Sequence, residues 1–222
     1  MSNRYSHKES PYSSHSLLLA RLPAIGHAQK LLDVGCWDGT VSVQYLERGF
    51  AVTGIERSRH SNLAEGIELV VADLHLGLPE LAAKFDYVVC ADVLEHLLDP
   101  LNILRSLRAQ MAVDGKLLAS LPNSGHWYFR LMVLLGRFPK EPNGLFDSTH
   151  LHFFTWDGWM ELFCEAGFVV ERIEPSSIPL SLILPNVNPA ITIAVGERLH
   201  YWLARLWMRM FAYQFVATFK IK

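Results

Sequence analysis

The sequence has few cysteines, no excess of charge of one sign and no uninterrupted apolar run that suits a membrane span. Its three cysteines, Cys36, Cys90 and Cys164, lie far apart without a Cys-x-x-Cys pair, which excludes a zinc ribbon and a disulfide framework. Such cysteine usage favours a reducing, cytoplasmic setting. Twenty basic and 22 acidic residues give a net charge of −2, so electrostatics give no reason to expect a nucleic-acid partner.

Two segments need to be distinguished from targeting or membrane elements. Met1–Ser16 is rich in serine, histidine and tyrosine and lacks the apolar stretch of a signal peptide, and we expect residues 1–14 to form a mobile arm. Pro175–Gly196 contains no charged residue and is long enough to cross a bilayer. Its four prolines would each break the helical hydrogen-bond ladder that a span requires, so we expect no transmembrane helix.

Half of the 222 residues are hydrophobic. In the first half of the chain, short continuous apolar runs alternate with segments whose apolar residues recur at helical spacing. Short apolar runs predict buried strands at 30–34, 51–55, 67–72, 85–90 and 115–121. Helical patterns precede or separate them at 15–21, 40–48, 58–64 and 99–111. Strands that alternate with helices predict an α/β fold, a parallel sheet with helices on both faces.

After residue 121 the pattern becomes less regular. Residues 122–154 are loop-like with a short apolar helix near 128–135, and they predict an insertion. A helix is predicted at 155–166 and strands at 168–173 and 213–221. The apolar segment 175–212 forms a second insertion before the last strand. We expect one domain over residues 1–222.

The segment Leu32–Thr40 carries the strongest chemical signal, because a strand runs there into a glycine-bearing turn that opens a helix. Gly35 lets the backbone approach a ligand closely, and free amides at a helix start favour a negative group. Glu56 ends the next strand, where a carboxylate can bind a ribose diol. The spacing is neither Gly-x-Gly-x-x-Gly nor a phosphate-binding loop. The pattern therefore favours an adenosine ligand other than a dinucleotide or a nucleoside triphosphate.

Asp33-Val-Gly-Cys-x-x-Gly39, Glu56, Asp73 and Ala91-Asp-Val-Leu-Glu-His96 resemble the class I S-adenosylmethionine-dependent methyltransferases in order and spacing. The resemblance implies a Rossmann-like seven-stranded sheet, mostly parallel with an antiparallel last strand. It also implies S-adenosyl-L-methionine as the methyl donor and S-adenosyl-L-homocysteine as the product.

The same resemblance implies a role for each matching position. Asp33 and Gly35 would line the methionine end, and Glu56 would hold the ribose hydroxyls. The remaining expected cofactor-binding residues are Asp73 at the adenine amino group, Leu74 on the adenine ring, Ala91 and Asp92 beside the methyl donor, and Cys36 and Gly39 in the turn. Trp37 stands where the family usually has glycine, and we expect its ring to point outward.

Three histidines flanking the first insertion, His126, His150 and His152, are candidate catalytic residues. The resemblance implies an acceptor pocket there, and a histidine of near-neutral pKa can remove a hydroxyl proton. Alternatively, these side chains cap loops or fill the core. Asp92-x-x-Glu95-His96, with His150 or His152, also has the side-chain types of a metal site. Because the family commonly carries this run without metal, no metal is predicted.

Two local resemblances bear on the acceptor. Residues 144–155 are similar to methyltransferases encoded with bacterial glycan-assembly enzymes, and residues 121–127 resemble MetW-like proteins. We therefore expect O-methylation of a hydroxyl on a sugar, a lipid-linked glycan or another small molecule. The alternative is a non-catalytic, MetW-like partner of a biosynthetic enzyme.

The sequence also indicates what the second insertion contacts. Residues 197–212 predict a basic helix rich in tryptophan, which either packs on the sheet, covers the acceptor, forms a homodimer contact or lies on a membrane. Partners are thus a small-molecule or glycan acceptor, without nucleic acid. A peripheral contact of residues 178–211 with the inner membrane face stays open.

Overall fold

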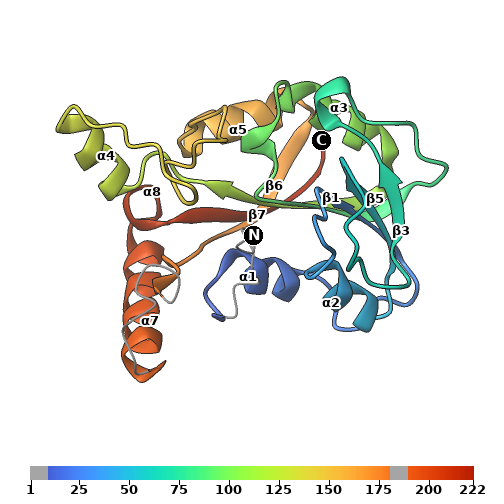
Figure 1. The fold of residues 1–222 in the computed structure, drawn as a ribbon, viewed down its shortest axis with the longest axis horizontal. Coiled ribbons are helices and arrows are strands. Elements are labelled where there is room, and N and C mark those ends of the chain that lie inside the picture. Colours follow the sequence, from blue (N-terminus) through green and yellow to red (C-terminus); the bar gives the residue numbers. More distant parts are fainter. Residues whose placement is uncertain (1–9, 181–189) are drawn as a thin grey trace.

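The computed structural model describes residues 10–180 and 190–222, and its centre is a mixed sheet (Figure 1). The seven strands of this described part are β1 (Lys30–Val34), β2 (Ala51–Glu56), β3 (Glu68–Val71), β4 (Phe85–Ala91), β5 (Met111–Pro122), β6 (Phe168–Pro175) and β7 (Gln214–Ile221). Their order in the sheet is β3-β2-β1-β4-β5-β7-β6. Only β7 runs antiparallel to its neighbours, β5 and β6. The predicted strands and fold class are confirmed.

Helices cover both faces of the sheet, with α1 and α2 on one side and α3 and α5 on the other (Figure 1). The described helices are α1 (Ser14–Arg21), α2 (Ser42–Glu47), α3 (Pro100–Gln110), α4 (Trp127–Leu134), α5 (Trp156–Glu165), α7 (Ala190–Leu206) and α8 (Met208–Phe211), with 3₁₀ turns η1 (Leu74–Leu76) and η2 (Leu94–His96). The start of α3 shows how local sequence sets these bounds. Asp99 caps it by accepting a hydrogen bond from the Asn102 amide at 3.0 Å, and Pro100 occupies its first turn.

The predicted helix at 58–64 is wrong, because the chain there forms turns and loop. Ser58, Asn62 and Gly66 favour turns over a helix interior. Leu63 and Ile67 pack instead against Gly39, where an added Cβ would lie 2.8 and 2.9 Å from their methyl groups. Burying these two side chains against the turn after β1 takes precedence over helix formation.

The predicted basic helix at 197–212 is divided into α7 and α8 at Trp207, whose φ of −139° and ψ of 76° are not helical. Two contacts hold the chain in its new direction. Arg209 donates two hydrogen bonds to the Asp157 carboxylate at 2.8 and 2.6 Å. Asn123 donates to the Ala212 carbonyl at 2.8 Å. The break directs the chain from α8 into β7.

Each face of the sheet contributes to a separate core cluster. Leu32 faces the side of α3 and α5 together with Trp159 and Phe163, whereas its neighbour Leu31 faces the side of α1 and α2 with Tyr45. All five side chains are 1% exposed or less. Parallel strands covered on both faces are apolar at consecutive positions, which explains the continuous apolar runs in the sequence.

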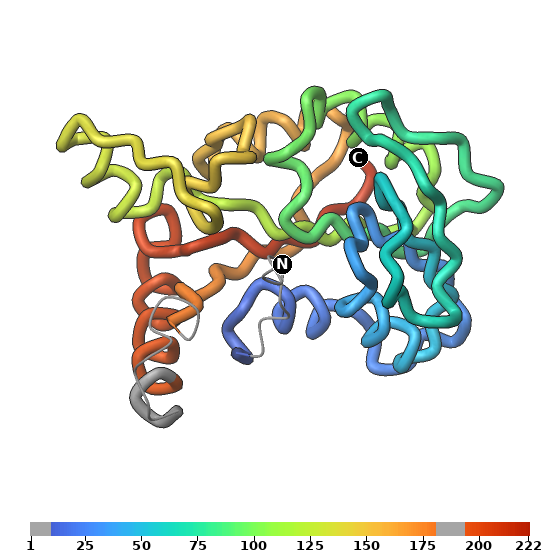
Figure 2. The backbone as a smooth tube through the Cα atoms, in the orientation of Figure 1, coloured from blue at the N-terminus to red at the C-terminus, as the bar shows by residue number. Residues whose placement is uncertain are grey.

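The second insertion leaves the sheet at the end of β6, and α7 extends away from the rest of the chain (Figures 1 and 2). Glu174 anchors it by accepting a hydrogen bond from the Tyr201 hydroxyl and by pairing with Arg21 at 2.9 Å. Tyr12, from the predicted arm, packs on Tyr201 with ring centroids 4.7 Å apart. Residues 1–9 of that arm, and Pro185 and Pro189, lie outside the described residues. Within the described ranges, no helix combines the length and apolar character needed to cross a membrane.

Replacing Phe163 by alanine should destabilise the fold strongly. Its ring stacks on Phe219 at a centroid separation of 3.8 Å inside the α5 core cluster. Phe→Ala changes in a core cost about 3–5 kcal/mol, and we expect a loss of that size in urea-unfolding experiments. The control Val113→Ala, at a side chain 92% exposed, should change stability by less than about 0.5 kcal/mol. Equal effects of both changes would contradict this description of the core.

Candidate active site

A cavity of about 980 Å³ opens at the carboxyl ends of the parallel strands, the edge where ligands bind in open α/β sheets. Eight of the nine predicted cofactor-binding residues line it: Asp33, Gly35, Cys36, Glu56, Asp73, Leu74, Ala91 and Asp92. The ninth, Gly39, is not among the lining residues. It lies in the turn after β1, with a positive φ of 78°, and packs under Leu63. Residues at the ends of four different strands, which the sequence analysis assigned to one site, therefore do line one cavity.

Gly35 makes the turn after β1 possible. Its φ is +70°, and an added Cβ would lie 2.7 Å from a methyl carbon of Val93. Its amide and that of Cys36 both donate to the Ile55 carbonyl, at 2.8 and 3.1 Å. The turn is therefore fastened to β2, and only glycine fits at its first position.

Trp37 has a φ of +51°, which lies in the left-handed region. This backbone conformation favours glycine, the residue that the family usually has at this position. This conformation costs a non-glycine residue about 1–2 kcal/mol. The ring packs on His60 at a centroid separation of 4.4 Å and is 37% exposed, while the residue also lines the cavity. The Trp37 amide donates to Glu56 at 3.0 Å, so the turn keeps its shape despite the bulky side chain.

The acids differ in how deeply they lie. Asp33 is buried and accepts a hydrogen bond from the Ser42 hydroxyl at 2.5 Å, and burial raises the pKa of its carboxyl to about 7. Asp73 lies near the entrance. Its pKa is lowered by the hydrogen bond from the His75 amide, with a further contribution from Arg57, 3.3 Å away. Glu56 accepts from the Arg57 amide at 2.8 Å.

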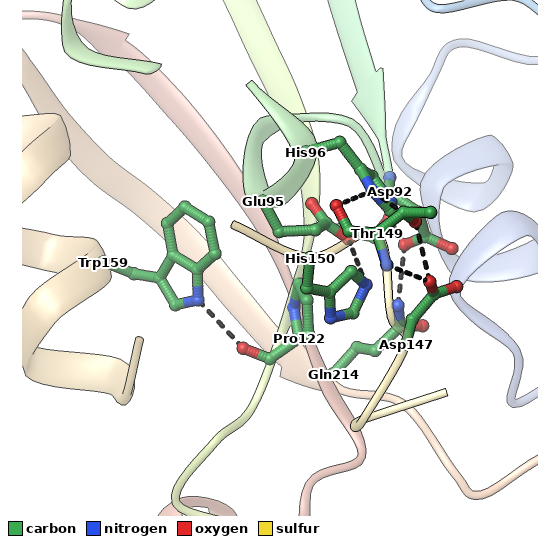
Figure 3. Close-up of polar contacts among 10 residues, drawn as sticks. Asp92, Glu95, His96, Pro122, Asp147, Thr149, His150, Trp159 and Gln214 are labelled. Atoms are coloured by element: carbon green, nitrogen blue, oxygen red, sulfur yellow. Dashed lines mark hydrogen bonds and ion pairs between the residues drawn. The ribbon is translucent and has the colours of Figure 1, made fainter. Parts of the chain in front are cut away.

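Asp92 is the most constrained residue of the cavity. Its φ is +57°, rare for a non-glycine residue, and strained backbone of this kind clusters at functional sites. Its carboxylate accepts hydrogen bonds from the Ser120 hydroxyl and, at 2.6 Å, from the Gln214 amide group. Figure 3 shows Gln214 reaching Asp92 from the last strand. Sequence reasoning missed both partners, since β5 and β7 supply them from distant positions.

The structure brings two of the three candidate histidines to the cavity. His126 is 1% exposed and caps α4, accepting from the Tyr128 amide at 3.3 Å, and it lines the cavity. His150 also lines the cavity. His152 is not among the lining residues; its Nε2 lies 2.8 Å from the Leu97 carbonyl, and its ring stacks on Phe154.

The two cavity histidines are far from the near-neutral pKa expected of a general base. Burial lowers the pKa of His126 to about 3, with a smaller effect from His200. Burial, together with His96, lowers that of His150 to about 4. Both imidazoles are therefore neutral at pH 7. His126 already uses Nδ1 to accept from the Tyr128 amide, which leaves its Nε2–H as a donor. Both side chains bind a proton more weakly than an ordinary histidine.

Beyond the strand-end residues the cavity has apolar lining residues that sequence analysis did not predict individually. The first insertion supplies Trp127, Leu145 and Phe146, and the second supplies Ile178 and Leu180. Tyr213, just before β7, closes this part of the cavity, and burial raises the pKa of its hydroxyl. Both predicted insertions thus contribute to the lining of one cavity, although Phe146 and Ile178 are 32 positions apart in the sequence.

Comparisons with known proteins agree with this geometry. Residues 6–173 match the methyltransferase-domain family. The ubiquinone biosynthesis O-methyltransferase of Haemophilus ducreyi is 34% identical over 119 residues, 48% of this chain and 50% of the relative. That of Aeromonas salmonicida is 28% identical over 140 residues, 57% of each. The chain spans about half the length of the curated relatives it matches.

Solved structures show the same fold at low identity. The Haloferax volcanii complex of the Trm112 activator with a methyltransferase has a TM-score of 0.65 at 14% identity, covering 96% of this chain and 90% of that one. The Burkholderia thailandensis 1,6-didemethyltoxoflavin N1-methyltransferase, with bound S-adenosylhomocysteine, has a TM-score of 0.59 at 17% identity, covering 94% and 76%. The chain belongs to the class I S-adenosylmethionine-dependent methyltransferase family.

The low pKa of His126 predicts a pH-dependent stability. Below its unfolded pKa of about 6.5 the unfolded chain binds this proton and the folded chain does not, so stability falls as the pH falls towards 3. Replacing His126 by asparagine, which keeps a capping oxygen, should remove about 2 kcal/mol of the stability loss between pH 7.5 and 5. Urea unfolding at both pH values measures this difference. The exposed control His27→Asn should retain the wild-type slope, and an unchanged slope in the His126 variant would contradict the prediction.

Proposed function

We propose that this enzyme transfers the methyl group of S-adenosylmethionine to a hydroxyl of a small molecule with a substantial apolar part. The observation that carries the proposal is the single cavity that joins the strand-end acids to the apolar wall. The relatives named ubiquinone biosynthesis O-methyltransferase support a hydroxyl acceptor. They give no support for the sugar or lipid-linked glycan acceptor that we expected from the sequence. Methylation of such an acceptor stays a narrower proposal within the same reaction.

The residues at the strand ends fit the methyl donor. Gly35 leaves room for close approach of a ligand to the backbone. Glu56 offers carboxylate oxygens at the end of β2, where we propose that they accept hydrogen bonds from the ribose hydroxyls. Asp73 and Leu74 then face the adenine, and Asp33, Cys36, Ala91 and Asp92 surround the methionine end. When bound, the donor supplies an electrophilic methyl group on a sulfonium.

On the acceptor side the chain has to orient a hydroxyl and separate it from its proton. The neutral imidazole of His150 can accept a hydrogen bond from that hydroxyl. Nδ1 of His126 already accepts from the Tyr128 amide, so its Nε2–H can only donate, to an oxygen of the acceptor. As the acceptor oxygen bonds to the methyl carbon, the carbon–sulfur bond breaks and the hydroxyl proton passes to water. Holding the two reactants in line is the main catalytic contribution of such a site, and the constrained Asp92 fixes the wall beside the methyl group.

Glu56→Gln tests the donor site. Hydrogen bonds to a charged group contribute about 1.5–3 kcal/mol, so S-adenosylhomocysteine should bind about ten- to a hundredfold more weakly in calorimetry. The control is Glu47→Gln, at an exposed position in α2, which should bind like the wild type. Circular dichroism confirms that both variants fold. If the wild-type chain binds neither S-adenosylmethionine nor S-adenosylhomocysteine, the proposed function is wrong.

We also propose that α7 rests on a membrane surface at the cytoplasmic face, which would bring a lipid-tailed acceptor to the cavity. Leu199, Trp202, Leu206 and Trp207 are each more than half exposed. Arg205 lies over the Trp202 ring at 5.3 Å. Exposed tryptophan and leucine beside arginine is the composition of interfacial helices.

A flotation experiment tests the membrane proposal. The wild-type chain should float with vesicles that contain anionic phospholipid and much less with neutral vesicles, because the arginines add electrostatic attraction. The double change Trp202→Ser and Trp207→Ser should abolish flotation. Val113→Ser, at a similarly exposed apolar position far from α7 in sequence, is the control. Equal flotation of all three chains, or none with the wild type, rejects the proposal.

A further inference from the structure

Glu95, His96 and His150 form a carboxylate–imidazole group at the acceptor side of the cavity. One ligand-type atom from each lies within 4.8 Å of the other two, and all three residues line the cavity. Glu95 and His96 come from η2 and His150 from the first insertion, and Figure 3 shows the three side chains together. The sequence offered these side-chain types for a metal site but could not show that His150, rather than His152, lies beside η2.

The tautomer of His96 follows from its partners. Its Nδ1 lies 3.1 Å from the Thr149 carbonyl, which can only accept. The Thr149 hydroxyl donates to Asp147 at 2.7 Å, so its proton is not directed to the imidazole. Nδ1 of His96 therefore carries the proton, and Nε2 keeps its lone pair. A histidine that donates its other ring N–H to a carbonyl is the usual arrangement around a bound metal.

The distance between His150 and Glu95 also suits an ion. Nε2 of His150 lies 3.9 Å from Oε1 of Glu95, too far for a hydrogen bond. Bonds of about 2.0–2.1 Å to zinc place two tetrahedral ligand atoms about 3.4 Å apart. The 3.9 Å pair needs only a small movement, and rotation of the imidazoles can close the wider separation within the group.

Backbone hydrogen bonds also hold the loop in place. The backbone carbonyl of Glu95 accepts hydrogen bonds from the amides of Leu151 and His152, at 2.8 and 3.2 Å. These two bonds already fasten the loop to η2. The carboxylates of Asp92 and Asp147 line the same cavity, and their negative charge favours a bound cation.

We propose that Glu95, His96 and His150 bind one divalent transition-metal ion, with zinc as the reference ion. Two imidazoles and one carboxylate suit such ions better than magnesium or calcium, which prefer oxygen ligands. Three protein ligands leave an open position, which faces the cavity. Resting on the proposed function, the ion would replace the hydrogen bond from the acceptor hydroxyl to His150, hold that hydroxyl and lower its pKa. The proton passes to water, and the oxygen bonds to the methyl carbon as the carbon–sulfur bond breaks.

Cobalt(II) titration of the full, chelator-treated chain tests the site directly. We expect a visible d–d absorption band that saturates at one equivalent and disappears when zinc is added, because zinc binds such ligands more tightly than cobalt. Glu95→Gln and His150→Asn should each weaken cobalt binding at least a hundredfold. His27→Asn, which changes an exposed histidine outside the cavity lining, is the matched control and should titrate like the wild type.

Two outcomes would overturn the metal site: no saturable band with the wild-type chain, or the same band in the Glu95 and His150 variants. If a variant does not fold by circular dichroism, thermal unfolding of the wild type with and without zinc replaces it. A higher melting temperature with zinc is expected, and no change overturns the proposal. Calorimetry with S-adenosylhomocysteine on the same samples separates the two proposals, since it reports the donor site without the metal.

Discussion

The rest of the site depends on the turn between β1 and α2, where the chain adopts left-handed backbone at three of five consecutive positions, Gly35, Trp37 and Gly39. The hydrogen bonds from Gly35 and Cys36 to Ile55, and from Trp37 to Glu56, tie this turn to the end of β2. A side chain at Gly35 would fill the space beside Val93, and the Trp37 hydrogen bond holds Glu56 next to the turn. The strain at Trp37 is tolerated because these contacts determine the turn's shape together.

The strand-end half of the cavity was predictable from sequence because each of its residues lies at, or just after, the carboxyl end of a strand. Buried parallel strands are recognisable as short apolar runs, and right-handed connections bring their carboxyl ends to one edge. Asp33, Glu56 and Asp73 therefore needed no knowledge of distant contacts. The same reasoning failed at 58–64, where Leu63 and Ile67 pack beneath Gly39 and this tertiary contact overrides a weak helical pattern.

For the apolar half of the cavity, the sequence predicted which segments contribute but not which of their residues line it. Its wall combines Phe146, Ile178 and Tyr213, and no local pattern pairs such positions. The low pKa values of His126 and His150 arise from burial, which a sequence does not reveal for a single histidine. Gln214 offered one weak sign of a functional role, because it is a lone amide at the start of an alternating strand. Its hydrogen bond to Asp92 could not be predicted, since it depends on the position of β7 beside β5.

The second insertion begins and ends at one point of the sheet. The Ser176 amide donates to the Gln214 carbonyl at 2.9 Å, the Gln214 amide donates to the Ser176 hydroxyl at 3.1 Å, and the Tyr213 amide donates to the Ser176 carbonyl at 3.2 Å. A loop closed in this way can change in length at little cost to the sheet. The segment beyond Ser176, including the cavity residue Ile178, can therefore vary while the strand that carries Gln214 keeps its hydrogen bond to Asp92. This part of the cavity lining can thus change in evolution independently of the strand-end residues.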